Sequence, residues 1–308
     1  MGASGGQLPS NLAALGFDTK YPIHIASSPG RLDVIGGIAD YSGSRVIQMP
    51  IESHTTVYIQ RKWKSKKVGK GAIAITSINK SGEHTEKFVK IPMCTFFLNN
   101  QETTLQKYEN LNYNFSRYKS WSAYIIGPIF ICAKENDIRL STRDNFVIYI
   151  TSSVPEGKGV SSSAAVEIAS CMAFLSLFGH SPSIKKAWKH APLYSFFAEN
   201  AIAGVPCGIM DQLACYHGKL KHLIPFTCSL PPLVGKQLEF SKKYLKLWGI
   251  DSTVRHFNGN SSYGRVRAAA FMGRHIIIKE SLLFRTFETL CSINRVFNSE
   301  QVNILHDF

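Results

Sequence analysis

Alternating apolar and polar positions in the first half of the chain predict a β-sheet. The clearest alternation spans Val46–Trp63, where residues such as Val57 and Ile59 suit a half-buried strand. Phe146–Thr151, with the sequence FVIYIT, is almost wholly apolar and is typical of a buried strand. Shorter strands are expected at His24–Ser27, Ala72–Ile78 and Lys87–Ile91.

The second half of the chain mixes helical periods with short apolar runs. Strands are predicted at Leu223–Phe226 and Leu245–Ile250, and helices at Trp121–Asn136, Ala164–Phe178, Ile184–Ala203, Ser262–Ile278 and Ser281–Phe297. Pro192 must bend or interrupt the third of these helices, because proline removes a backbone donor. The polar run Asn99–Ser116 predicts a loop or a short helix. Strands first and mixed elements afterwards favour an α+β fold with two lobes.

Composition narrows the possible classes of protein. Of the 308 residues, 44% are hydrophobic and 18% are charged, as in globular rather than disordered chains. We expect no membrane span and no secretion signal, since no apolar stretch is long enough and the N-terminus lacks a basic start. The seven cysteines form no C-x-x-C pair and no cluster with histidine. This pattern argues against a zinc site and favours reduced thiols in the cytoplasm.

The chain carries a formal net charge of +14, part of which is clustered. One cluster is RKWKSKKVGK at 61–70, and another contains Lys185, Lys186 and Lys189. Basic clusters can bind nucleic acid, but no nucleic-acid-binding motif accompanies either one. A solvated basic loop is the simpler interpretation of the first cluster, and we expect no specific nucleic-acid or membrane partner.

The most informative stretch is Val154–Ala165, VPEGKGVSSSAA, between the predicted strand FVIYIT and a predicted helix. The first N–H groups of a helix have no partner within the helix, and the helix dipole adds positive potential, so a helix start can bind an anion. Gly157 and Gly159 allow positive φ and close approach of the backbone. An ordinary N-cap turn would look similar, and the turn is not a Walker A loop. Its three serines nevertheless suit a nucleotide phosphate or a metal ion.

Three further segments accompany this turn. They are SSPGRLDVIGGIADYSG at 27–43, ENAIAGVPCGIMDQ at 199–212 and GIDSTVRHFNGNSSYGRVRAAAFMGR at 249–274. The first resembles the galactokinase signature PGRVNLIGEHTDY, the second contains GIMDQ unaltered, and the third is similar to the stretch S-x-V-R-H…Y-x-x-R-R. With these motifs the chain resembles the GHMP small-molecule kinases, and within them the galactokinase branch. GGIADYSGS at 36–44 and QMPI at 48–51 also agree with the kinase domain of the plant L-arabinokinase group.

This resemblance implies a two-lobed GHMP kinase fold. Its N-terminal lobe would resemble domain 2 of ribosomal protein S5, and its C-terminal α/β lobe would be incomplete. The expected parts are an N-terminal extension at 1–22, an ATP-binding lobe at 23–205 and a partial C-terminal lobe at 206–308.

The resemblance also implies the roles of individual residues. Asp211 matches the catalytic aspartate, which can take a proton from the acceptor hydroxyl, and Arg31 matches the arginine that keeps it ionised. Mg²⁺ is expected on Ser163 and Glu199, whose oxygens are hard ligands. The triphosphate of ATP is expected on the segment Gly157–Ser163, here called the phosphate loop: Gly157, Lys158, Gly159, Val160, Ser161, Ser162 and Ser163. Lys158 is an auxiliary contact that the family pattern does not require. The expected sugar contacts are Gly37, Asp40, Tyr41, Gly208 and Tyr263.

Two departures from the family pattern concern substrate and activity. The galactokinase signature has Glu-His where this chain has Gly37 and Ile38, and the family's glutamate holds the C6 hydroxyl of the sugar. L-arabinose has the hydroxyl arrangement of galactose without C6. Beside the apolar Ile38, a hexose hydroxyl would be left unpaired at a cost of about 1–3 kcal/mol. The family's third glycine-rich motif is not found before Phe308.

We therefore predict an ATP- and Mg²⁺-dependent sugar 1-kinase that phosphorylates the anomeric hydroxyl of L-arabinose. One alternative is a galactokinase. Another is a sugar- or ATP-binding paralogue, or a truncated fragment, with impaired catalysis. The missing third motif favours this second alternative. A third hypothesis is a basic nucleic-acid-binding protein, which would show steeply salt-dependent affinity for duplex DNA. The oligomeric state stays open.

Overall fold

The computed structural model of the chain describes residues 13–62, 70–79, 85–96, 120–179, 181–240, 247–251, 253 and 261–283. The strands in these ranges are β1 (His24–Ile35), β2 (Arg45–Lys62), β3 (Ala72–Asn79), β4 (Thr85–Pro92), β5 (Asn145–Ser152), β6 (His222–Thr227), β7 (Leu233–Val234) and β8 (Leu238–Glu239). The α-helices are α2 (Ala123–Glu135), α3 (Ser162–Ser176), α4 (Pro182–Lys189), α5 (Ala191–Ala201), α6 (Met210–His217) and α7 (Ser261–Leu283). Short 3-10 helices are η1 (Ala39–Ser42), η2 (Met93–Phe96) and η3 (Ser120–Ser122).

The described strands join in one mixed sheet around the long strand β2. β1 pairs antiparallel along one edge of β2. Along the other edge, β5 pairs with Thr55–Lys62 and β6 pairs with Arg45–Gln48, both antiparallel. β3 continues the sheet parallel to β5, and β4 follows antiparallel to β3. One strand therefore connects the region around β5 with the region around β6.

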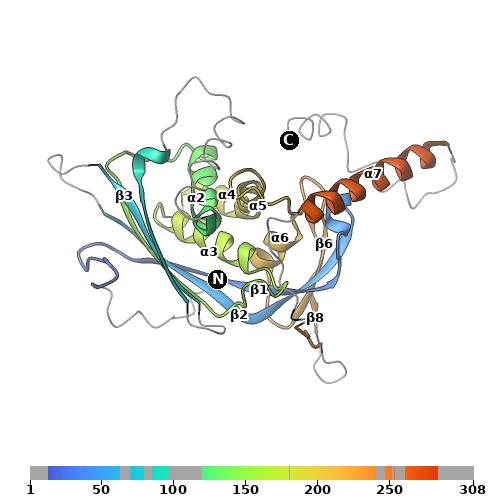
Figure 1. The fold of residues 1–308 in the computed structure, drawn as a ribbon, viewed down its shortest axis with the longest axis horizontal. Helices are drawn as coiled ribbons and strands as arrows, with labels where there is room; N and C mark the ends of the chain where they lie inside the picture. The colour runs from blue at the N-terminus through green and yellow to red at the C-terminus, as the bar shows by residue number, and fades with distance from the viewer. Residues whose placement is uncertain are drawn as a thin grey trace.

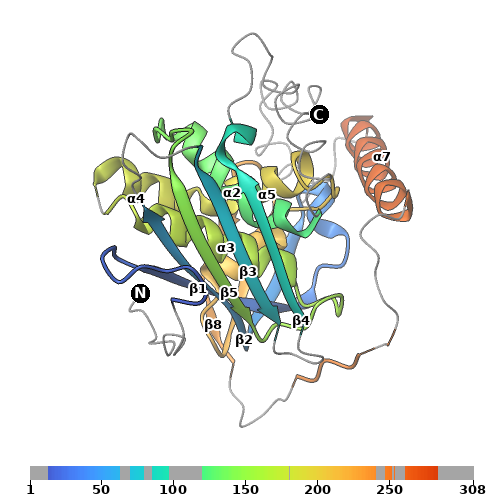
Figure 2. The ribbon, with the colours of Figure 1, turned by 60° about the vertical axis from the view of Figure 1, so that its left-hand side comes forward.

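Helices α2, α3 and α5 cover one face of this sheet (Figures 1 and 2). The alternation in β2 places Val57 and Ile59 on the covered face, where both are buried. They belong to the main apolar cluster with Ile75 of β3, Ile148 of β5 and Phe174 of α3. Burial of these side chains stabilises this half of the molecule.

The other face of the sheet is partly covered by residues 13–23. Phe17 packs against Tyr58 and Tyr149. Gln60, fully buried on β2, donates through Nε2 to the carbonyl oxygens of Asp18 and Tyr21, both at 2.8 Å. Part of the segment expected as an extension thus packs on the sheet, and the domain boundaries stay a prediction.

Most predicted elements, and the α+β class, are confirmed. The strand predicted at His24–Ser27 continues to Ile35, because β2 pairs with it along its length. The helix predicted at Ile184–Ala203 is two helices that meet at His190, and Pro192 lies in the first turn of α5, where proline is tolerated.

Two predictions on the C-terminal side are wrong. In the described part of Leu245–Ile250, residues 247–250 form no strand, and Trp248 and Ile250 are 81% and 92% exposed. No break separates Ile278 from Ser281, because α7 continues to Leu283 through lysine and glutamate, which favour helix. Helix α6 has no counterpart among the predictions. Asn99–Ser116 and residues 284–297 lie outside the described residues.

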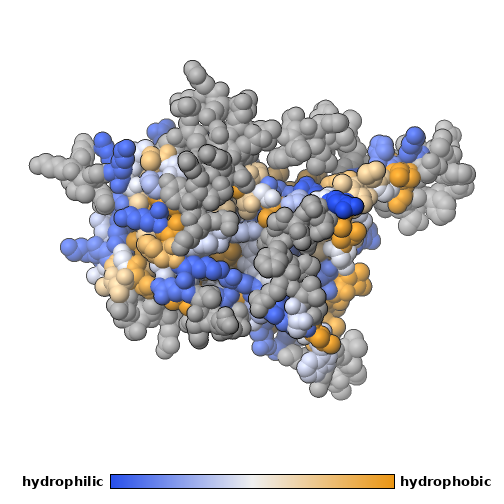
Figure 3. Space-filling model, in the orientation of Figure 1, coloured by the Kyte–Doolittle hydropathy of each residue, from blue (hydrophilic) through white to orange (hydrophobic). Residues whose placement is uncertain are grey.

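Helix α7 projects from the end of the molecule that carries η1 and β6 (Figure 1). Its residues Met272, Ile276 and Ile277 are more than half exposed, and Figure 3 shows apolar side chains at the surface of this helix and along the edge beneath it. No described helix has both the length and the apolar character needed to cross a membrane.

Candidate active site

The phosphate loop follows β5 and runs into the first turn of α3. Gly157, Gly159 and Ser161 have positive φ angles of 68°, 69° and 58°. Left-handed residues at alternate positions turn successive backbone N–H groups toward one side, an arrangement that binds anions. Ser162 and Ser163 form the first turn of α3. The buried hydroxyl of Ser161 has no hydrogen-bonding partner within the part of the chain that the structure describes. The loop therefore has the shape and the donors of a phosphate site.

Arg31 of β1 contacts both the phosphate loop and Asp211 of α6. Its Nε and Nη2 donate to Oδ1 of Asp211 at 3.0 and 2.6 Å. Its Nη1 donates to the carbonyl oxygen of Gly159 at 2.7 Å, and its backbone N–H donates to that of Val160 at 3.1 Å. The Arg31 side chain is 8% exposed and that of Asp211 is 26% exposed. Asp211 is thus paired with a buried guanidinium and remains accessible to a ligand.

Asp40 of η1 is buried beside Asp211. Burial raises the pKa of the Asp40 carboxyl to about 7, the negative charge of Asp211 adds to this shift, and backbone N–H groups of Met210 and Tyr41 oppose it by donating to the carboxylate. A Cβ atom on Gly208 would lie 1.8 Å from Oδ2 of Asp40. Only glycine fits at position 208 while Asp40 keeps this position.

A buried polar cluster lies between α3, α5 and α6. Gln212, which follows Asp211 in α6, donates through Nε2 to Oε2 of Glu199 at 2.7 Å and to Oε2 of Glu167 at 3.1 Å. Burial raises the pKa of Glu199 to about 7, while hydrogen bonds from Cys207, Ser163 and Gln212 favour its charged form. Burial also raises the pKa of Glu167 well above its usual range. Ser163 and Glu199 therefore face each other, as a shared metal ion would require.

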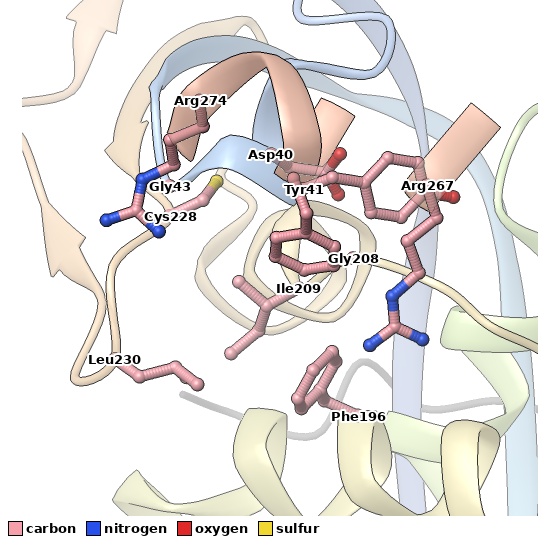
Figure 4. A pocket seen from close by; sticks show the side chains of 11 residues that line it. Asp40, Tyr41, Gly43, Phe196, Gly208, Ile209, Cys228, Leu230, Arg267 and Arg274 are labelled. Atoms are coloured by element: carbon pink, nitrogen blue, oxygen red, sulfur yellow. The ribbon is translucent and has the colours of Figure 1, made fainter. Parts of the chain in front are cut away.

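An open pocket extends from Asp40 toward α7 (Figure 4). Its wall is largely apolar, and two arginines of α7, Arg267 and Arg274, lie on opposite sides of it. Nη1 of Arg267 donates to Oδ1 of Asn200 at 2.8 Å, which joins α7 to α5. The other lining residues are Tyr41, Gly43, Phe196, Gly208, Ile209, Cys228, Leu230 and Phe271.

Two family models match separate parts of the chain. The GHMP kinases N terminal domain matches residues 126–219, which include the phosphate loop and Asp211. The galactokinase galactose-binding signature matches residues 16–61, which include Arg31 and Asp40. The chain contains a GHMP kinase N-terminal domain.

Curated relatives of this chain are sugar kinases by name. L-arabinokinase of Arabidopsis thaliana is 35% identical over 277 residues, which cover 85% of this chain and 26% of that protein. Galactokinase of Thermosipho africanus is 30% identical over 268 residues, which cover 87% of this chain and 63% of that protein. The present chain thus spans between about a quarter and under two thirds of the length of these relatives.

A solved structure supports the fold. Lactococcus lactis galactokinase complexed with galactose matches with a TM-score of 0.51 at 23% identity, over 73% of this chain and 49% of that one.

The structure brings most of the expected site residues together. Arg31, Asp211 and the phosphate loop are in contact, and Asp40 lies against Gly208. Lys158 of the loop forms an ion pair with Asp251. Tyr263 falls in the first turn of α7, but its side chain lies outside the described residues.

Sequence reasoning missed the buried pair of Glu167 and Gln212. Glu167 lies four residues after Ser163, so the two share a face of α3. That spacing is the signal that could have identified Glu167. Gln212 belongs to the motif GIMDQ, in which the resemblance gives roles to Gly208 and Asp211 but none to Gln212.

Proposed function

We propose that this protein transfers a phosphoryl group from ATP to the anomeric hydroxyl of a monosaccharide, and that the monosaccharide is L-arabinose. One observation carries the proposal: Arg31 contacts Asp211 and the carbonyl oxygen of Gly159 at the same time. The Arg31 side chain therefore contacts both the carboxylate that would deprotonate the acceptor and the loop that would bind the donor. Phosphoryl transfer depends chiefly on such positioning and on stabilisation of charge.

The phosphate loop fits the nucleotide. Its alternating left-handed residues and the buried Ser161 hydroxyl would contact the triphosphate, with the first turn of α3 behind them. Ser163 and Glu199 would hold Mg²⁺. No group of three or more His, Cys, Asp or Glu side chains suited to a metal occurs among the described residues, so the other ligands would be phosphate oxygens and water. When bound, MgATP supplies the phosphoryl group and neutralises part of its charge.

Asp211 would act as the general base. Both contacts from Arg31 go to Oδ1, so Oδ2 is the oxygen that we assign to the acceptor hydroxyl. The proton of that hydroxyl would move to Oδ2 as the acceptor oxygen bonds to the γ-phosphorus and the bond from that phosphorus to the bridging oxygen breaks, with ADP as the leaving group. Arg31 would keep Asp211 ionised beforehand and would face the charge on the transferred group.

The choice of sugar rests on the turn before η1. Asp40 would accept hydrogen bonds from sugar hydroxyls above Gly208. Gly37 offers no side chain, and Ile38 is apolar and 51% exposed, so the turn has no polar group for a C6 hydroxyl. These features support a pentose over a hexose. A galactokinase remains the second candidate, because several relatives bear that name.

The variant Asp211→Asn tests the catalytic assignment. An ADP-coupled assay with L-arabinose, D-galactose and D-glucuronate should show turnover that prefers L-arabinose. Asp211→Asn should lower kcat about 10²- to 10⁴-fold without altering ATP affinity, because general-base catalysis contributes factors of this size. Glu135→Gln, an exposed acid at the end of α2, is the matched control and should keep full activity.

Calorimetry separates the alternatives. Binding of sugar and ATP by folded wild-type protein without turnover of any sugar would contradict the catalytic assignment and support a binding paralogue. Turnover that prefers galactose would contradict only the choice of sugar.

A further inference from the structure

Asp33 of β1 and Gln48 of β2 lie directly opposite each other in the sheet. Immediately after Asp33 the register shifts, because β1 has one more residue, Val34, than β2 at this point. Such bulges redirect side chains and are frequent beside active sites. Nε2 of Gln48 donates to Oδ1 of Asp33 at 2.7 Å, and Gln48 is fully buried.

The second carboxylate oxygen of Asp33 binds the turn that leads to η1. The backbone N–H of Gly37 donates to Oδ2 of Asp33 at 2.6 Å, and Gly37 has a φ of +57°. A Cβ atom on Gly36 would lie 2.5 Å from Oδ1 of Asp33 and 3.1 Å from Nε2 of Gln48. The turn therefore lies in contact with the Asp33–Gln48 pair, and glycine at position 36 is what permits this approach.

The pair also lies next to the start of α6. Nε2 of Gln48 is 3.6 Å from Sδ of Met210, and the backbone N–H of Met210 donates to Asp40. Met210 precedes Asp211. Gln48 thus lies close to Gly36 and, through Met210, is connected to Asp40. The segment Gly36–Asp40 is here called the sugar turn.

We propose that Asp33 and Gln48 are a positioning pair that sets the sugar turn against α6, and so determines which sugar the site accepts. This inference rests on the proposed function. The galactokinase signature has asparagine at the place of Asp33 and glutamate at the place of Gly37. In this chain Gly37 has no side chain that could bind the sugar. The backbone N–H of Gly37 instead donates to Oδ2 of Asp33. The pair would thereby set the position of Asp40 relative to α6, which carries Asp211.

The two residues allow a reciprocal exchange. Gln48→Glu places a second carboxylate against Asp33, so repulsion should displace the turn. Adding Asp33→Asn restores a donor and an acceptor: the amide of Asn donates to Glu, and its oxygen accepts from Gly37. The double variant carries one negative charge, as the natural pair does. Gln60→Glu is the matched control, because Gln60 is an equally buried glutamine on the same strand, far from the sugar turn.

Two measurements test the pair. In hydrogen–deuterium exchange, Gln48→Glu should speed exchange in the peptide that contains Gly37, and the double variant should restore protection. In calorimetry, Gln48→Glu should weaken L-arabinose binding about tenfold or more and change ATP binding less than about twofold, and the double variant should recover to within about threefold. The ratio of affinities for L-arabinose and D-galactose should shift in Gln48→Glu alone.

The outcomes separate this inference from the proposed function. If wild-type protein binds no sugar, the proposed function fails, and the exchange measurement still decides whether the pair holds the turn. Unchanged exchange in Gln48→Glu would overturn the inference. So would restored protection without restored sugar binding, or a loss of sugar affinity of the same size in Gln60→Glu.

Discussion

The proposed phosphate side and the proposed sugar side of the site differ in how closely the surrounding structure packs around them. On the phosphate side, the loop is bounded by β5, α3 and Arg31, and the adjoining residues Ala164, Ala165 and Ile168 are fully buried. On the sugar side, Gly37 and Ile38 are exposed, and the nearby helix α7 carries exposed apolar side chains.

The cores beneath the two sides differ as well. The sheet and helices behind the phosphate loop share the main apolar cluster, whereas the sugar turn lies beside a smaller cluster that includes Val46, Leu213 and Phe226. A few specific contacts therefore set the geometry of the sugar side, such as those between Asp40 and Gly208 and between Asp33 and Gln48. We expect substitutions to affect sugar binding more readily than nucleotide binding, and the following predictions test that difference.

Gly208→Ala should have the largest effect. The added Cβ would lie 1.8 Å from Oδ2 of Asp40, so Asp40 must move. A displacement of this size should lower kcat/KM for the sugar about 10²-fold, with ATP affinity unchanged. Gly264→Ala on α7, where a Cβ has open space, is the control. Equal losses of sugar and ATP affinity in Gly208→Ala would remove the distinction between the two sides.

Asp40→Asn should have an intermediate effect that depends on pH. The pKa of Asp40 is about 7 in the folded chain, above its ordinary value of 3.8, so the unfolded chain releases this proton first as pH rises. The stability associated with the neutral carboxyl is present below about pH 4 and is lost as pH rises to about 7. At pH 8 Asp40→Asn should therefore be more stable than wild type, by roughly 1–3 kcal/mol.

Denaturant unfolding between pH 4 and pH 8 measures this difference, which should vanish near pH 4. Sugar affinity should be lower in Asp40→Asn than in wild type, because the asparagine offers fewer acceptors to sugar hydroxyls. In wild type that affinity should rise as pH passes through 7 and Asp40 ionises. A stability difference that does not change with pH would contradict the assigned burial of the Asp40 charge.

The ion pair of Lys158 with Asp251 should give the smallest effects. Both side chains are partly exposed, and exposed pairs contribute about 0–1 kcal/mol. Lys158→Met should weaken ATP binding up to about fivefold through loss of a phosphate contact, and Asp251→Asn should strengthen it about twofold by releasing Lys158. Titration with ATP at low and high salt measures both. If neither variant changes ATP affinity, Lys158 does not contact the phosphates.

The sequence predicts the parts of the fold in which a local pattern has one structural solution. The alternation in β2 and the apolar run of β5 give strands, and the glycines of the phosphate loop give positive φ. Motif order also identifies Arg31 and Asp211 as partners. These features depend on neighbouring residues or on short motifs.

Other features depend on contacts that no local pattern contains. The strand at Leu245–Ile250 is wrong in its described part because an apolar run forms a strand only where another strand pairs with it. Gln48 and Glu167 gain their importance from Asp33 and Gln212, which the fold alone brings next to them. The cytoplasmic location, the domain boundaries and the individual site roles stay predictions.

The double contact of Arg31 has a thermodynamic consequence. The phosphate loop cannot shift without disturbing a hydrogen bond to this guanidinium, and the guanidinium cannot turn without releasing Asp211. Two ligands that bind on either side of one such residue change each other's affinity, and by the same factor in both directions. Nucleotide and sugar would then form a cooperative pair, in which the dissociation constant of each depends on the concentration of the other.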